Sequence, residues 1–157
     1  MTPDAWAPRL ATVDDAADAA RLLHDFNTEF DTPTPGPEVV ADRLRVLLAG
    51  DGTFAVLAGT PPVAIALVTL RPNVWYAGPV ALLDEMYVVP GLRGRGIGSA
   101  VIGEMVSTCR ARDVGLIEIN VDESDVDAQR FYERHGFSPI DPDSNERAFY
   151  FTRELTG

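Results

Sequence analysis

The sequence predicts a single α/β domain of the α+β type, with a mixed, mainly antiparallel central sheet flanked by helices. Its 157 residues are the size of one domain with a core of its own. Apolar residues recur at helical spacing in two separate regions, and short apolar runs typical of strands lie between them. A glycine-rich turn joins one of these runs to the next helix. We expect residues 1–157 to form this domain, with residues 1–7 as a flexible N-terminal arm.

The first half of the chain predicts one strand, two helices and a hairpin. Pro8–Ala11 is typical of a short strand. Thr12 with Asp15 three residues later resembles a capping box, so a helix is expected from there to about Phe30. Three prolines within residues 31–37 exclude helix in that segment. We then expect a helix over Glu38–Ala49, followed by two antiparallel strands over Thr53–Ala58 and Val63–Leu70.

The second half predicts a parallel β-α-β crossover, a further helix and a last strand. A strand over Val80–Val89 leads through a turn at residues 90–98 into a helix whose apolar stripe includes Cys109. A strand over Val114–Val121 then completes the crossover. The remaining expected elements are a helix over about Asp125–His135, ending at Gly136, and a last strand over Arg147–Arg153.

The charge excludes several classes of protein. The formal net charge is −11, and all 13 basic residues are arginine. This acidity argues against sequence-independent nucleic-acid binding and against attachment to anionic lipid. The absence of lysine excludes the P-loop signature, which requires one. No apolar run is long enough to span a bilayer, and the N-terminus does not resemble a signal peptide.

The few cysteine and histidine residues restrict the location and the metal chemistry. Cys109 is the single cysteine and fits a reducing cytoplasm, so we expect a cytoplasmic protein. It lies on an apolar helix stripe and is expected to be a core residue. His24 and His135 are far apart in the sequence, so no metal site is predicted.

The turn over residues 88–99 has the composition of a phosphate-binding loop. Gly94, Gly96 and Gly98 let the backbone turn tightly where a strand becomes a helix, and the N–H groups of the helix start favour an anion. Arg93 and Arg95 add positive charge, and residues 86–103 contain no acidic residue. The dinucleotide fingerprint G-x-G-x-x-G does not fit, because the sixth position is Ser99 or Val101 rather than glycine.

Two blocks of the sequence resemble the GNAT-type N-acetyltransferases. The first is Arg93-x-x-Gly96-x-Gly98, which follows Tyr87-Val88-Val89-Pro90 and is similar to the acyl-CoA pyrophosphate loop of that family. The second is Asp125-x-x-Ala128-x-x-Phe131-Tyr132-Glu133-x-x-Gly136-Phe137, which resembles the family's later helix and strand. The order of elements also agrees, so the resemblance covers nearly the whole chain. It implies a GNAT acyltransferase-like fold and acetyl-CoA as the acyl donor, without a metal.

The resemblance implies the following donor-binding residues. Backbone groups of the turn would hold the CoA pyrophosphate, and the end of the preceding strand would pair with the pantetheine arm, with an N–H near Val88 polarising the thioester carbonyl. The family usually has asparagine where this chain has Asp125. An ionised aspartate cannot donate a hydrogen bond to pantetheine, so either it caps its helix instead or nearby groups take over that contact. The cofactor-binding residues implied are Met86, Tyr87, Val88, Arg93, Gly94, Arg95, Gly96, Ile97, Gly98, Ser99 and Asp125.

Acetyl transfer to an amine needs a base for the amine and an acid for the departing thiolate. By the resemblance, Tyr132 is that acid. Asp84 and Glu85 are candidate bases, acting directly or through water, and regular strand alternation would let only one of them face a given cleft. Burial beside apolar strand residues would raise the pKa of such a carboxyl and make it a better base.

The acceptor site is expected to involve two segments that line the acceptor cleft in the family. The candidates are Phe26, Glu29, Phe30, Trp75, Tyr76 and, from a strand, Asn120. We expect acetyl transfer by direct attack to the primary amine of a small cationic molecule or a peptide, because an acidic surface attracts cations. A non-catalytic acyl-CoA sensor is the alternative. The oligomeric state, monomer or homodimer, stays open.

Overall fold

The computed structural model describes residues 3–156. The chain divides into two compact units, Met1–Ile119 and Asn120–Gly157. Of the predicted N-terminal arm, residues 1 and 2 lie outside the described residues, and Pro3–Trp6 form a short 3₁₀ helix.

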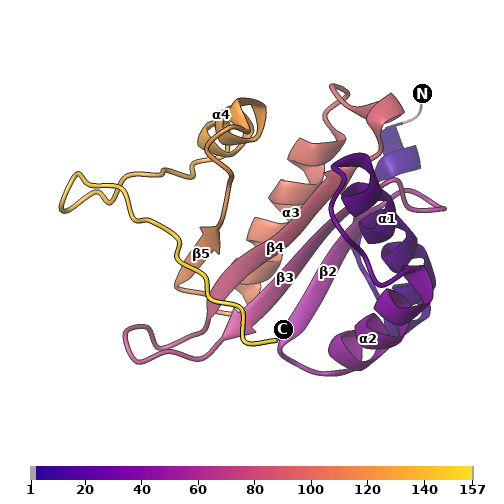
Figure 1. The fold of residues 1–157 in the computed structure, drawn as a ribbon, viewed down its shortest axis with the longest axis horizontal. Helices are drawn as coiled ribbons and strands as arrows, with labels where there is room; N and C mark the ends of the chain where they lie inside the picture. The colour runs from indigo at the N-terminus through magenta and orange to yellow at the C-terminus, as the bar shows by residue number, and fades with distance from the viewer. Residues whose placement is uncertain (1–2, 157) are drawn as a thin grey trace. The chain divides into compact units, whose positions relative to one another are not determined.

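The first unit contains the predicted mixed, mainly antiparallel sheet (Figure 1). Its strands are β1 (Pro8–Leu10), β2 (Thr53–Ala58), β3 (Ala64–Arg71), β4 (Val80–Val88) and β5 (Leu116–Ile119). They lie side by side in chain order. The pairings from β1 to β4 are antiparallel, and β4 pairs with β5 in parallel. The predicted hairpin and parallel crossover are therefore confirmed.

Helices cover both faces of this sheet (Figure 1). They are α1 (Ala16–Glu29), α2 (Pro37–Ala49) and α3 (Ile97–Ala111), with 3₁₀ helices at Val13–Asp15 and Pro90–Leu92. On one face, α1 and α2 bury small and aliphatic side chains against Leu57, Ile65 and Tyr87. On the other face α3 buries Met105 and Cys109, and burial raises the pKa of the Cys109 thiol. Cys109 is thus a core residue, as predicted.

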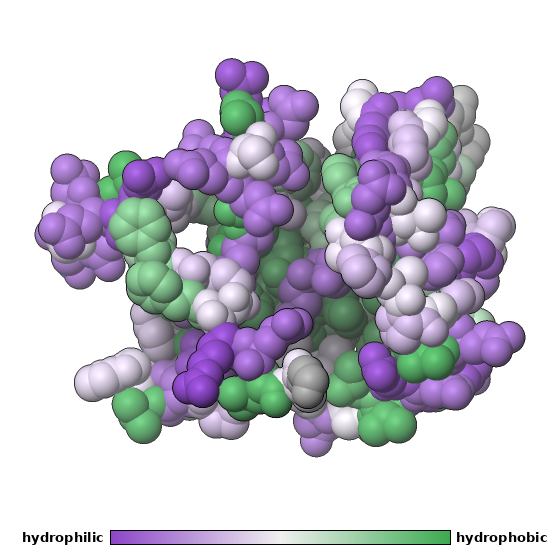
Figure 2. Space-filling model, in the orientation of Figure 1, coloured by the Kyte–Doolittle hydropathy of each residue, from purple (hydrophilic) through white to green (hydrophobic). Residues whose placement is uncertain are grey.

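The entry to α1 is held by the predicted capping residues. The Thr12 amide donates to the Asp15 carboxylate at 2.8 Å, and both Nη atoms of Arg9 donate to the same carboxylate at 2.9 Å. The hydrogen bonds from Arg9 have the largest effect and, with that from Thr12, lower the pKa of Asp15 to about 2. The first turn before α1 is therefore tied to β1 at neutral pH. Figure 2 shows hydrophilic and neutral residues covering much of the outer surface over α1 and α2.

A β-bulge interrupts β4 in its middle. Glu85 lies opposite Leu67 and Leu83 lies opposite Val68, so Asp84 is an extra residue on the β4 side. Strict alternation of side chains is broken at such a bulge. Glu85 consequently lies on the same face as Leu67 and Tyr87, the face covered by α1 and α2.

β5 is shorter than the predicted strand Val114–Val121. The Val114 amide donates to the Cys109 carbonyl at 3.0 Å, which extends the end of α3. Asp113 has a positive φ of 56°, and the Gly115 amide donates to the Pro79 carbonyl at 3.0 Å. This turn uses the first two residues of the predicted strand, so the strand begins at Leu116.

The second unit contains α4 (Val126–Arg134) and a long irregular segment. The predicted last strand over Arg147–Arg153 is wrong: the described residues show one antiparallel bridge between Ile140 and Arg147, and residues 148–156 belong to no helix or strand. A short apolar run such as Ala148–Phe151 forms a strand only where a partner edge accepts it. Here Phe149 and Phe151 stay 71% and 90% exposed.

Among the described residues, no helix has the length and apolar character needed to cross a bilayer.

Candidate active site

The turn between β4 and α3 has the backbone geometry of an anion-binding loop. Gly94 and Gly96 have φ values of 76° and 83°, which side chains other than glycine rarely adopt. The first intrahelical donor is the Ala100 amide, which donates to the Gly96 carbonyl, so the N–H groups of Ile97 and Gly98 have no acceptor within the helix. Successive N–H groups of this kind, at the positive end of a helix, attract phosphate.

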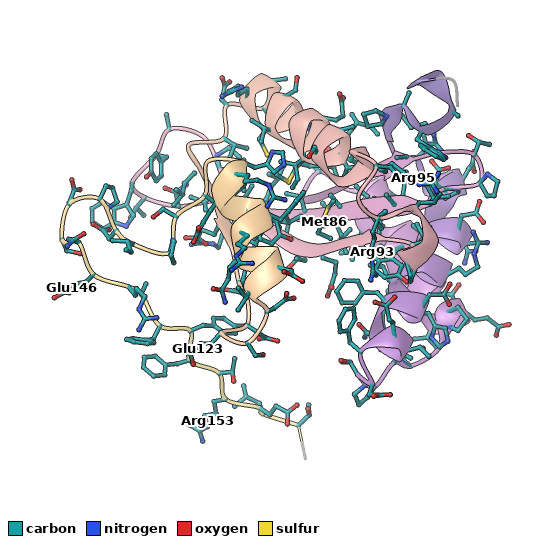
Figure 3. All side chains as sticks on the ribbon, turned by 90° about the horizontal axis from the view of Figure 1, so that it is seen from above. Met86, Arg93, Arg95, Glu123, Glu146 and Arg153 are labelled. Atoms are coloured by element: carbon teal, nitrogen blue, oxygen red, sulfur yellow. The ribbon has the colours of Figure 1, made fainter. Side chains whose placement is uncertain are left out.

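The two arginines of the turn have different surroundings (Figure 3). Arg93 Nη2 donates to both carboxylate oxygens of Glu29, the last residue of α1, at 2.8 and 3.0 Å. The turn contains no acidic residue of its own, but the Glu29 carboxylate from α1 lies against it. Arg95 has no ion pair with any residue from 3 to 156, which leaves it as the uncompensated cation of the turn.

The end of β4 offers an open edge beside this turn. β5 pairs with β4 only from Val80 to Leu83. Beyond Leu83, no strand within the described part of the chain pairs with that edge, so residues 84–88 can accept an added extended chain. Met86, Tyr87 and Val88 are the predicted pantetheine-binding residues in this stretch. The Val88 carbonyl already accepts a bond of 2.9 Å from Arg93 Nε.

The two candidate bases lie next to each other on one face of the sheet. Asp84 accepts a hydrogen bond from the Thr69 hydroxyl, and Thr69 pairs with Leu82 in the register of that face. The prediction that only one of them can face a cleft is therefore wrong, because it assumed regular alternation and the bulge removes that.

Glu85 has the properties of a base. Its side chain is half-buried, and burial, followed by the charge of Asp84, raises the pKa of its carboxyl. Within residues 3–156 that carboxylate takes part in no hydrogen bond or ion pair. A half-buried, unpaired carboxyl with a raised pKa is typical of a functional group.

One group of predicted acceptor residues lies beside this face. Phe26 packs edge-on against Tyr87, with ring centroids 5.0 Å apart, and contacts Phe30 at 5.3 Å. Glu29 accepts a bond of 3.2 Å from the Tyr87 hydroxyl. Burial and then the Glu29 charge raise the pKa of Tyr87, which keeps that hydroxyl protonated. The end of α1 thus contacts β4 two residues from Glu85.

Trp75 and Tyr76 lie at the other end of β4. They precede its first residue, whereas the turn follows its last, and nine strand residues span about 30 Å. Tyr76 packs on Gly115, where an added Cβ would lie 2.4 Å from the tyrosine ring. Asn73 shapes this loop by accepting bonds from the amides of Trp75 and Tyr76. The structure therefore does not bring these aromatics to the glycine-rich turn at residues 90–98.

Three predicted residues belong to the second unit. The Asp125 carboxylate caps α4 by accepting a bond of 3.0 Å from the Ala128 amide, which agrees with the capping alternative. Tyr132 lies on α4, and its ring contacts Phe131 and Phe137. Asn120 is exposed just after β5. Their roles toward donor and acceptor stay predictions.

Residues 3–156 contain no group of three or more His, Cys, Asp or Glu side chains that could hold a metal ion. The donor set of the turn is instead made of amide N–H groups and arginine, which suits a phosphate-bearing molecule.

Comparisons with known proteins identify the family of the chain. The model of the Acetyltransferase (GNAT) family matches residues 17–137, so the chain belongs to the GNAT family of acetyltransferases. A crystal structure of a protein from Arthrobacter sp. FB24, designated an acetyltransferase, is 53% identical, with a TM-score of 0.88 over 94% of this chain and 95% of that chain.

Two more distant relatives share part of the sequence or the fold. Mycothiol acetyltransferase from Beutenbergia cavernae is 35% identical over 74 residues, which is 45% of this chain and 25% of that protein. The chain spans about a quarter of the length of the curated relatives it matches. An aminoglycoside acetyltransferase from an uncultured soil metagenomic sample has the same fold, with 16% identity and a TM-score of 0.81 over 99% of this chain and 100% of that one.

Proposed function

We propose that this protein transfers an acetyl group from acetyl-CoA to the primary amine of a small cationic molecule or a peptide, by direct attack of the amine. The observation that carries the proposal is the combination on β4 of an unpaired, half-buried Glu85 with an open strand edge that ends in an anion-binding turn.

The donor side fits an acyl-CoA. The N–H groups of residues 94–99 and the Arg95 guanidinium would hold the pyrophosphate, and the open edge at residues 84–88 would hold the pantetheine arm. Acetyl-CoA supplies an activated thioester carbonyl when bound. An N–H near Val88 would polarise that carbonyl, which stabilises the charge that develops during attack.

The amine must lose a proton to attack. Glu85 is the better placed base, because burial disfavours its charged form and its carboxylate is not committed to another side chain. Asp84 accepts a hydrogen bond from the Thr69 hydroxyl, and its charge would help to raise the pKa of Glu85. Tyr132 would protonate the thiolate, as the family motif implies.

The acceptor class follows from charge. The net charge of −11 raises the encounter rate with cations, and two adjacent carboxylates lie on the face where the amine would be deprotonated. A small polyamine, an aminoglycoside or a basic peptide satisfies both conditions.

Thiol release from acetyl-CoA in the presence of an amine panel tests the proposal. The panel contains small cationic amines, polyamines, aminoglycosides and peptides, with neutral alcohols as controls. We expect release with at least one cationic amine and none with the alcohols. Because the chain has no lysine, acetylation of its own side-chain amines cannot add to the signal. Acetyl-CoA binding without release by any amine would instead support the sensor alternative.

A further inference from the structure

Glu29 is bound on both oxygens, although it is a predicted acceptor ligand. Oε2 lies 2.8 Å and Oε1 lies 3.0 Å from Arg93 Nη2, and Oε1 also accepts the Tyr87 hydroxyl at 3.2 Å. The charge of Glu29 is thus neutralised by a cation of the donor turn. An acceptor amine that approached this carboxylate would have to displace Arg93.

The position of Glu29 does not favour its own helix. Glu29 is the last residue of α1, where the helix dipole disfavours a negative side chain. A neutral or basic residue at this position would make the helix more stable. Its carboxylate is compensated by a residue 64 positions later in the chain, so the contact connects α1 to the donor turn.

Arg93 joins three segments through this contact. Its Nε donates to the Val88 carbonyl at 2.9 Å at the end of β4, its Nη2 binds Glu29 on α1, and its guanidinium lies 5.4 Å from the Tyr87 ring centroid. Arg93 is also the residue from which the turn with positive φ values starts. Its Nη1 takes no part in these bonds and keeps two N–H donors.

We propose that Glu29 is a positioning residue for the donor loop: it fixes the Arg93 guanidinium, and with it the start of the loop at Gly94 and Gly96, and does not bind the acceptor amine. This inference rests on the proposed function, since it assigns the loop to the donor. Arg93 then acts mainly by connecting the start of the loop to β4 and α1, while Arg95 and the amides supply most of the attraction for phosphate.

Calorimetric titration of acetyl-CoA into wild type and Glu29→Gln separates this role from two others. If Glu29 positions the loop, the variant binds acetyl-CoA about tenfold more weakly, while kcat at saturating donor and the acceptor KM stay unchanged. If Glu29 only adds negative charge near an anionic donor, its removal tightens binding. If Glu29 binds the acceptor amine, the acceptor KM rises in the variant and its affinity for acetyl-CoA stays unchanged. Either of the last two results overturns the proposal.

Glu38→Gln is the matched control, because it removes one exposed negative charge from the neighbouring α2 without contact to the loop. It should leave donor affinity unchanged. Tyr87→Phe removes only the hydroxyl that donates to Glu29 and should weaken acetyl-CoA binding in the same direction by a smaller factor. If Glu29→Gln fails to fold, Tyr87→Phe with unchanged donor affinity would overturn the proposal.

A double variant provides a second readout. In the double variant Glu29→Gln/Arg93→Gln, the loss of binding free energy for acetyl-CoA should be clearly smaller than the sum of the losses in the two single variants. The reason is that both residues act through one contact. Additive losses would contradict the inference. Failure of the wild type to bind acetyl-CoA would overturn the donor assignment itself, a result distinct from all of these.

Discussion

Replacement of Glu85 by glutamine should lower kcat by about a hundredfold, with donor affinity within about twofold of wild type. Glutamine keeps the size of the side chain but cannot accept the proton of the amine. General bases contribute about 10² to 10⁴ to enzymatic rates, and the lower end suits a site where water can partly replace the carboxylate. Steady-state kinetics with the best acceptor measures the effect.

The pH dependence of kcat provides a second test of Glu85 as the base. Burial raises the pKa of Glu85, and only the ionised carboxylate can act as a base, so kcat should rise with pH through that raised pKa. In Glu85→Gln this acidic limb should disappear. Unchanged kcat together with an unchanged profile would exclude Glu85 as the base, and a larger loss in Asp84→Asn would transfer the role to its neighbour.

Stability serves as the folding control for Glu85→Gln. A carboxyl whose pKa is raised on folding favours the native state below its unfolded-state pKa, and this contribution is lost as the pH rises through the folded-state pKa. At neutral pH the ionised Glu85 is therefore unfavourable for folding. The variant should melt at a temperature no lower than that of wild type, so a loss of rate cannot be attributed to unfolding.

Replacement of Gly96 by valine should weaken acetyl-CoA binding by about one to two orders of magnitude. The φ of 83° at Gly96 lies in the left-handed region, which costs an L-residue about 1–2 kcal/mol and a β-branched one more. Apart from its own chain neighbours, no atom lies within 4 Å of a Cβ added at Gly96, so the expected strain comes from the backbone angle and not from a clash of that Cβ. The loop must therefore either keep its strain or change its shape.

Gly91→Val is the matched control for this prediction. Gly91 lies in the preceding 3₁₀ helix, does not have a positive φ, and offers equal space around an added Cβ. Titration calorimetry should give wild-type affinity for Gly91→Val and the large loss for Gly96→Val. Equal affinities for both variants would show that the left-handed backbone at Gly96 is not needed for the donor.

The order of elements along the chain and most of the helices could be predicted because their signals are local. Apolar spacing placed α1 and α2 within a few residues of their observed bounds, and the hairpin of β2 and β3 followed from two apolar runs around Pro61 and Pro62. The strand predicted over Arg147–Arg153 failed because a short apolar run does not reveal whether a partner edge is present.

The site was predicted less completely, because its main contacts join distant parts of the chain. The positive φ values at Gly94 and Gly96 follow from glycine spacing, but the pairing of Glu29 with Arg93 has no local signal. The bulge at Asp84 was missed for the same reason. Two adjacent acidic residues inside an apolar strand were the only indication that β4 departs from regular alternation.

We propose that residues 93–99 form the site that binds the pyrophosphate of the acetyl donor. Titration of ¹⁵N-labelled protein with CoA, followed by amide chemical shifts, tests it most directly. The largest shift changes should fall on the amides of residues 94–99 and spread to the open edge of β4 at residues 84–88. Saturable binding with unmoved amides over 94–99, and shifts concentrated elsewhere, would contradict it.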